Sequence, residues 1–253
     1  MADVVKAEQN LPVPLDYSQY AGQGTEQATA GDYALPFLMI LQKLSPQVDE
    51  TTIAYVKNAK AGMVFESATG QVWDGKEGVR LIPCYFRKDM VEWAPREAGG
   101  GFVKAHGWNE ELMGQCTRDE RGRMILPNGN LLVDTKYHYC LLLTEQGPMQ
   151  VVLSMTSTQL KKSRKWLSMI NMRRMTDKQG KSFIPPSFAY TYKLTTGQES
   201  NEKGTWFGWQ VEMGEAVVNP DVARQAVQFM RLVKEGNVKV ADPDAGMKDD
   251  IPF

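Results

Sequence analysis

The stretch that decides the fold reads LLVDTKYHYCLLLTEQGPMQVVLSM and covers residues 131–155. It contains two apolar runs, 131–143 and 149–155, which are rich in the leucine, β-branched and aromatic residues found in buried strands. Gln146, Gly147 and Pro148 separate the runs and are typical of a turn. We therefore expect a β-hairpin at the centre of the protein.

Further strands are expected on both sides of this hairpin. Upstream, VRLIPCYF (79–86) has the composition of a buried strand, and KDMVEWAPRE (88–97) is expected to return antiparallel to it. Downstream, SFAYTYKLTT (187–196) and TWFGWQVEMGEAVV (205–218) predict two more strands, joined by a polar loop at 197–204. These segments predict a sheet of five or more antiparallel strands.

A helix interrupts the series of strands. Residues 157–175 read STQLKKSRKWLSMINMRRM, with Thr156 or Ser157 as the N-cap. On a helical wheel the apolar arc and the cationic arc lie on opposite sides. The apolar arc contains Leu160, Ser163, Trp166, Leu167 and Ile170, and the opposite arc contains Lys161, Lys162, Lys165 and Arg173. The pattern predicts an amphipathic helix with a cationic outer face.

The sequence predicts that the chain is organised into four parts. We expect a flexible N-terminal arm at 1–33, a β body at 34–218, a closing helix at 219–236, and a flexible linker with a terminal tip at 237–253. Asn219 as the cap and Pro220 at the first position mark the start of the closing helix. The predicted fold is mainly β: an OB-type antiparallel barrel with an inserted basic helix, a C-terminal helix and disordered termini. Other small barrels fit the same pattern.

Charge is unevenly distributed along the chain. The net charge is −1, but residues 157–181 hold eight Lys and Arg residues against a single acid, Asp177. Such segregation indicates a local anion-binding surface on an otherwise acidic protein. With 42% hydrophobic and 23% charged residues and no long apolar run, the chain is expected to be a cytoplasmic globular protein without a membrane partner.

Most catalytic chemistries lack their motif in this sequence. There is no GxxxxGK[ST] loop, no CxxC or HxxxH pair and no nucleophile elbow, so no cofactor, metal or catalytic residue is expected. The three cysteines, Cys84, Cys116 and Cys140, are expected to be reduced thiols. Asp89, Glu92 and Glu97 are the acids that a metal-dependent nuclease would need, and salt-bridging or solvated roles are favoured for them.

The C-terminal tip has the chemistry of a docking peptide. Phe253 suits an apolar pocket, Pro252 limits backbone freedom, and the acids with the terminal carboxylate suit basic residues at a pocket rim. The predicted partner-docking residues are Asp249, Asp250, Ile251, Pro252 and Phe253.

This tip resembles that of bacterial single-stranded DNA-binding proteins, which end Asp-Asp-Asp-Ile-Pro-Phe. The sequence matches five of those six positions, and Lys248 replaces the first Asp, which makes the tip less acidic. The stretches LPFLMILQKLSPQV (35–48), LIPCYFRKDMVEWAPRE (81–97) and GGGFV (99–103) are similar to bacteriophage-encoded proteins with an assigned single-stranded DNA-binding role. The resemblance covers about 34–218 and implies an OB-type single-stranded DNA-binding protein working in the host cytoplasm.

Candidate DNA contacts combine cations with aromatic rings, because single-strand binders use the cations for phosphates and the rings for bases. Tyr190 and Tyr192 are the preferred stacking rings, and Trp166 either stacks or anchors its helix. The candidates in and after the basic helix are Lys161, Lys162, Arg164, Lys165, Trp166, Arg173, Arg174, Tyr190, Tyr192 and Lys193. A second cluster, a further candidate wall of a binding channel, comprises Arg87, Lys88, Trp93 and Arg96.

The sequence thus predicts a non-enzymatic protein that coats and protects single-stranded DNA during phage replication, recombination or repair. Its tail is expected to recruit a helicase, nuclease, primase or polymerase, and an oligomer is compatible with this role. Two alternatives stay open. One is a metal-dependent nuclease of phage DNA metabolism, and the other is a protein-only replication adaptor whose basic helix binds an acidic partner.

Overall fold

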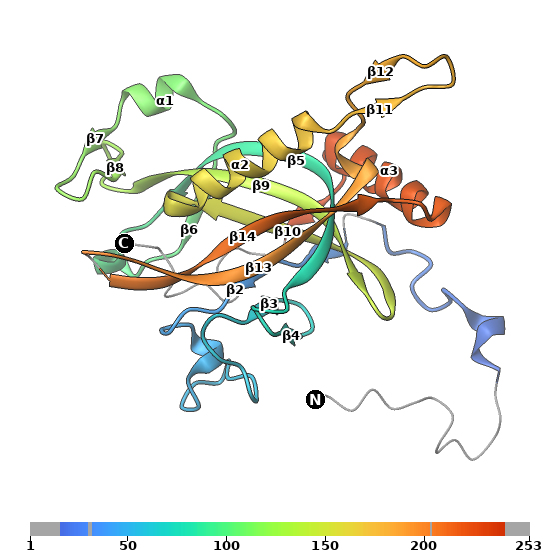
Figure 1. Ribbon diagram of the computed structural model, residues 1–253. Helices are drawn as coiled ribbons and strands as arrows, with labels where there is room; N and C mark the ends of the chain where they lie inside the picture. Colours follow the sequence, from blue (N-terminus) through green and yellow to red (C-terminus); the bar gives the residue numbers. More distant parts are fainter. Residues whose placement is uncertain (1–15, 30–31, 203, 241–253) are drawn as a thin grey trace.

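The computed structural model describes residues 16–29, 32–202 and 204–240, and it gives only the backbone of Arg96 and Lys239. The described chain is mainly β, with a curled antiparallel sheet and α-helices on both of its faces (Figure 1). The long strands are β5 (Val79–Trp93), β9 (Leu131–Thr144), β10 (Gly147–Thr156), β13 (Tyr190–Asn201) and β14 (Gly204–Ala216). They pair in the order β14-β13-β5-β9-β10.

Short strands extend this sheet or form small sheets beside it. They are β1 (Ala34–Leu35), β2 (Leu38–Ile40), β3 (Val64–Glu66), β4 (Val72–Trp73), β6 (Phe102–Ala105), β7 (Thr117–Arg118), β8 (Met124–Ile125), β11 (Met175–Thr176), β12 (Ser182–Phe183) and β15 (Lys239–Val240). The helices are α1 (Glu110–Gly114), α2 (Leu160–Met172) and α3 (Pro220–Lys234). Among the described helices, none has the length and apolar character needed to cross a membrane.

Alternation along the strands divides the core between the two faces of the sheet. In β9, Cys140 and Leu142 pack with α2, whereas Tyr139 and Leu141 pack with α3. The α2 side is the concave one, because side chains from β2, β10, β13 and β14 all meet there in one cluster. The convex face is covered by α3 through Ala226 and Phe229.

The sheet is a half-barrel. Pro36 O accepts a hydrogen bond from Val152 N, so residues next to β2 cover the free edge of β10. No described strand pairs with the outer edge of β14, and side chains bond to its backbone instead. The Gln42 amide bonds to Phe207 N (2.9 Å) and to Phe207 O (3.0 Å), Gln159 Oε1 accepts from Trp209 N (3.1 Å), and Arg173 Nη2 donates to Gly214 O (2.6 Å).

The predicted hairpin at 131–155 and the predicted closing helix are confirmed. β9 and β10 pair in continuous register from Thr135–Thr156 to Thr144–Gly147. Asn219 Oδ1 accepts from Asp221 N, with Pro220 at the first helical position, and Gly236 at φ 76° lies beyond the end of α3. The apolar segment at 34–44 contributes the short strands β1 and β2.

One predicted turn is wrong. Residues 79–97 do not form two strands, since β5 runs without a turn through Arg87 and Lys88 to Trp93. Its register against β9 shifts once, between Pro83 and Tyr85, a bulge that tolerates the missing proline N–H. The returning strand is β6, which pairs with residues 91–93 of β5.

Three other boundaries differ from the prediction. The helix predicted at 157–175 begins as a 3-10 turn, Ser157–Gln159, continues as α2 and ends at Met172. Thr156 occupies the N-cap position of this turn, as one of the two residues predicted for it, but its side chain makes no capping hydrogen bond. The loop predicted at 197–204 is mostly strand, because β13 and β14 pair as far as Asn201 and Gly204. Within the predicted linker, β15 pairs parallel to β1, and residues 241–253 lie outside the described part.

The predicted N-terminal arm is described from residue 16 onwards, with the gap at 30–31. It contains one 3-10 turn, Tyr17–Tyr20, where the side chains of Tyr17 and Tyr20 are exposed. Residues 1–15 lie outside the described part of the chain.

Candidate nucleic-acid interface

The inner face of α2 is fixed in the concave core. The Trp166 side chain is fully buried and stacks on the His138 ring, with 4.5 Å between centroids and 14° between planes. Tyr192 approaches the Trp166 ring edge-on at 5.9 Å and is itself 1% exposed. Both rings are therefore core residues that no base can reach in this structure, which corrects their prediction as stacking residues and leaves Trp166 as the anchor of the helix.

His138 is part of the same buried contact. Its Nε2 lies 2.8 Å from Ser163 Oγ on α2, and burial lowers the pKa of His138 to about 3. The imidazole is therefore neutral at physiological pH, and α2 is attached to the sheet by a stacked ring pair and one neutral hydrogen bond.

The outer face of α2 carries cations. Lys161, Arg164 and Lys165 are exposed, and no ion pair joins any of them to an acid in the described part of the chain. Lys162 differs, since its Nζ lies 2.6 Å from Glu199 Oε1 on β13. Lys162 is thus half-buried and already neutralised, whereas its three neighbours are open to an anion.

The C-terminal end of α2 is tied to the sheet. The Arg173 guanidinium carbon lies 4.2 Å from the centre of the Tyr190 ring, and Arg173 also donates to Gly214 O. Arg174 is exposed, and its Nη1 donates to the carbonyls of Asn171 (2.6 Å) and Arg173 (2.8 Å). Arg173 therefore packs on the face of the Tyr190 ring and is half-buried, whereas Arg174 is exposed.

Lys193 lies on the opposite face of the sheet from α2. Tyr192 and Leu194, its neighbours on β13, point into the concave core, so Lys193 points the other way. Its register partners are Arg80 on β5 and Glu212 on β14. Lys193 therefore does not join the α2 surface.

The second predicted cluster is divided by β5. Arg87 lies on the α3 side, 5.4 Å from the Tyr137 ring centre and 3.4 Å from Asp89 Oδ2. Trp93 packs edge-on against Phe102 at 5.9 Å, next to the convex core. Lys88 points to the α2 side by strand alternation, and the side chain of Arg96 lies outside the described residues.

A different basic-aromatic group forms around Lys88. Lys88 and Lys136 are direct partners across β5 and β9, and their Nζ atoms lie 4.0 Å and 4.4 Å from the centre of the Trp108 ring. Lys136 Nζ is also 2.5 Å from Asp134 Oδ1, and the Trp108 indole N–H donates to Glu110 at 3.1 Å. Sequence reasoning missed this group, because the register of β5 and β9 pairs the two lysines and the segment between β6 and α1 brings Trp108 to them.

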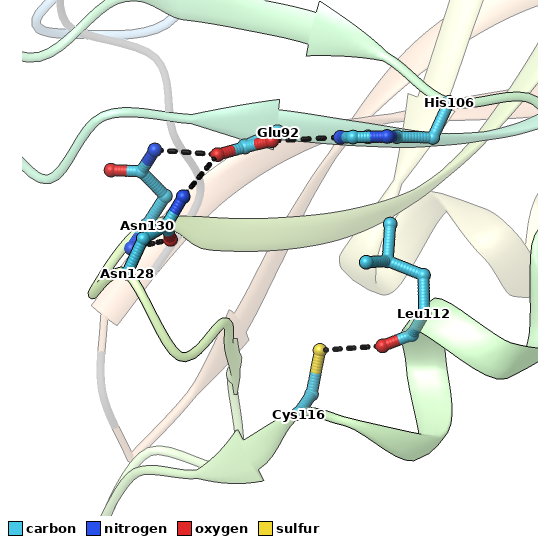
Figure 2. A network of polar contacts seen from close by, with 6 residues as sticks. All are labelled: Glu92, His106, Leu112, Cys116, Asn128 and Asn130. Carbon is cyan, nitrogen blue, oxygen red and sulfur yellow. Dashed lines mark hydrogen bonds and ion pairs between the residues drawn. The ribbon is translucent and has the colours of Figure 1, made fainter.

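A polar network holds the segment that carries Trp108 (Figure 2). Glu92 accepts hydrogen bonds from the side-chain amides of Asn128 (2.8 Å) and Asn130 (2.6 Å), and its other oxygen lies 2.7 Å from His106 Nε2. The bond from Asn130 contributes most to lowering the pKa of the Glu92 carboxyl below its usual value. His106 lies two residues before Trp108. By holding His106, Glu92 fixes the backbone segment that carries the Trp108 ring.

Replacing Glu92 with alanine is expected to lower the free energy of unfolding by about 1–2 kcal/mol. The reason is that two amides and an imidazole lose their shared acceptor in a site where Glu92 is only 6% exposed. Because the carboxyl pKa is lowered on folding, the contribution of its charge is present above pH ~4.5 and is lost as the pH falls. Urea unfolding at pH 7 and pH 4 measures this, with Glu92→Gln as the control that keeps an acceptor.

The acids considered for metal binding do not converge. Asp89 and Glu92 point to opposite faces of β5 by alternation, and Glu97 is exposed. Within the described residues, no three His, Cys, Asp or Glu side chains are grouped as ligands of one ion. The docking residues Asp249, Asp250, Ile251, Pro252 and Phe253 lie outside the described part of the chain.

A family model described as Pam3 phage gp34-like protein matches residues 5–239. No curated protein and no solved structure matches the chain.

Proposed function

The chain belongs to the Pam3 phage gp34-like protein family, and we propose that it is a sequence-independent single-stranded DNA-binding protein of phage replication or recombination. The observation that carries the proposal is the outer face of α2. Lys161, Arg164 and Lys165 are exposed there without an ion pair to any described acid, while the inner face of the helix is locked into the core.

The rigidity of this surface supports binding to a phosphate backbone. Trp166 and Ser163 hold α2 on the sheet, so the cations above them keep a fixed spacing. A cationic surface of fixed shape neutralises phosphates without reading base sequence, since every nucleotide offers the same charge. The OB-type barrel is proposed on the same basis: a half-barrel whose concave side is covered by one basic helix.

The Lys88–Trp108–Lys136 group supports a nucleic acid over an acidic protein. Lys136 is neutralised by Asp134, whereas the exposed Lys88 forms no ion pair with a described acid, and both ammonium groups lie against one half-buried indole on the same side of the sheet as α2. Cations around an aromatic ring suit a ligand that combines phosphates with flat bases. An adaptor for an acidic protein, the second candidate function, needs the cations but not the ring.

The C-terminal tip is proposed to recruit replication enzymes. Its Ile-Pro-Phe end supplies apolar anchors and its two Asp residues supply charge for a basic rim. A labelled peptide of residues 245–253 is expected to bind a purified helicase, nuclease or primase of the host. Loss of Phe253 should abolish that binding, and equal binding of a scrambled peptide would contradict the docking role.

The α2 surface is tested by replacing Lys161, Arg164 and Lys165 with alanine together. Affinity for oligo-dT at 0.1 M salt is expected to fall about 100-fold, because each lost phosphate contact removes about 0.7 from the slope of log K against log salt. Fluorescence anisotropy at several salt concentrations measures both quantities. The matched control replaces three exposed lysines elsewhere, Lys57, Lys60 and Lys76, and should change the affinity far less.

Three results would count against this proposal. Wild-type protein that does not bind oligo-dT at low salt is not a single-strand binder. Cleavage of a labelled strand in Mg²⁺ or Mn²⁺ would support the nuclease alternative. Equal affinity of the α2 triple variant and the wild type would remove the helix from the binding surface.

A further inference from the structure

A β-hairpin extends from the end of α2. The chain leaves the helix at Met172 and forms β11 and β12, which in Figure 1 project beyond the helix and away from the sheet. Met175 pairs with Phe183, and Thr176 pairs with Ser182. The Asp177 carboxylate shapes the turn by accepting from Gln179 N (2.9 Å) and Lys181 N (2.8 Å).

The base of this hairpin is anchored, although its tip is exposed. Arg173 bonds to Gly214 O on β14 and lies over the Tyr190 ring, and the Tyr190 hydroxyl lies 3.4 Å from Arg174 O. The first residues of the hairpin are therefore fixed to the main sheet. Because Arg173 is held at the end of α2, the hairpin leaves the helix in a defined direction.

The exposed side chains of the hairpin are of two kinds. Arg174, Lys178 and Lys181 are exposed cations, and no described acid forms an ion pair with them. Phe183 is 42% exposed and Ile184 is 51% exposed. Phe183 adds little stability to a hairpin of only two paired positions, and together with Ile184 it places two apolar side chains at the surface of the same hairpin as these cations.

We propose that the β11–β12 hairpin is the contact that distinguishes single-stranded from duplex DNA. Lys178 and Lys181 bind phosphates, and the Phe183 ring stacks on an unpaired base. The inference rests on the proposed function and adds a selectivity element to it.

The mixture of groups favours DNA over other partners. The cations continue the positive surface of α2, so a polyanion that follows the helix reaches the hairpin next, whereas a second copy would bring like charges together. A phosphate contact alone does not discriminate between strands, because duplex DNA carries phosphates as well. A ring discriminates, since the faces of bases in a duplex are already stacked on each other.

The test measures the affinity of full-length protein for oligo-dT and for a duplex of equal length across a range of salt concentrations. Phe183→Ser is expected to weaken oligo-dT binding about tenfold, the effect of losing one stacked base, with the duplex affinity and both salt slopes unchanged. Phe183→Trp should restore the single-strand affinity. The double variant Lys178→Gln with Lys181→Gln should lower the affinity for both ligands. For oligo-dT, the slope of log K against log salt should decrease in magnitude by about 1.4.

The control is Ile184→Ser, which removes an exposed apolar side chain without a ring and should leave both affinities within about twofold. Several outcomes overturn the inference. If wild type binds oligo-dT and Phe183→Ser binds it equally well, the hairpin role falls while the proposed function stands. If Phe183→Ser lowers the affinities for oligo-dT and for the duplex by the same factor, the hairpin does not distinguish the two. If the wild type binds no oligo-dT, both proposals fall. A dimer that Phe183→Ser converts to a monomer, with DNA affinity unchanged, would make the hairpin a contact between copies.

Discussion

Replacing Trp166 with alanine is expected to lower the free energy of unfolding by about 3–5 kcal/mol, the range for deleting a fully buried large ring. The Trp166 side chain is 0% exposed and contacts the rings of His138 and Tyr192, so its loss opens a cavity between α2 and the sheet. Urea unfolding followed by circular dichroism measures the change.

The neighbouring cation supplies the control for this experiment. Lys165→Ala removes an exposed side chain from the same turn and should change the unfolding free energy by less than about 0.5 kcal/mol. The free energy of unfolding of Trp166→Phe should lie between those of Trp166→Ala and Lys165→Ala. The anchor role would be contradicted by a Trp166→Ala protein of wild-type stability whose single-strand affinity is lost, because that pattern belongs to a stacking residue.

Acidification from pH 7 to pH 4 is expected to remove about 3 kcal/mol of stability through His138 alone. Burial lowers the pKa of this histidine to about 3, whereas in the unfolded chain it is about 6.5. Below pH 6.5 the unfolded state binds a proton that the folded state excludes, so the unfolding free energy falls as the pH falls, down to the folded pKa.

The comparison of wild type with His138→Phe isolates this effect from the carboxylates that titrate in the same range. The phenyl ring keeps a stacking partner for Trp166 and cannot be protonated, so the stability advantage of wild type over the variant should shrink by about 3 kcal/mol between pH 7 and pH 4. A constant difference would show that His138 has the same pKa in the folded and the unfolded chain, and so is not excluded from protonation by burial. The ring signals of His138 in an NMR titration provide an independent measure.

The parts of the fold that local patterns determine could be predicted. Residues 131–155 contain two strands and their turn in one continuous stretch, and the hairpin of β9 and β10 follows that division. Asn219 and Pro220 mark the start of α3 by their own backbone preferences. The position of Trp166 within the apolar arc of its helix also identified it correctly as a possible anchor.

The parts that depend on register could not be predicted. Arg87 and Lys88 are adjacent charges that suggest a turn, but in β5 they point to opposite faces, where Arg87 meets Tyr137 and Lys88 meets Trp108. That arrangement depends on the bulge at Pro83 and on the pairing of β5 with β9, and the pairing has no local signal. The burial of Tyr192 likewise depends on the curl of the whole sheet, since alternation alone does not say which face becomes the core.

The side chains that bond to the outer edge of β14 also affect how this protein behaves when many copies are close together. An open strand edge is a template on which another chain can add a strand, and that addition leads to swapped assemblies or fibrils. Here the amide of Gln42 bonds to Phe207 in the manner of a neighbouring strand, and Gln159 and Arg173 occupy further edge groups. Crowded copies are thereby hindered from joining by strand addition at these positions, and contacts between them are left to surface side chains.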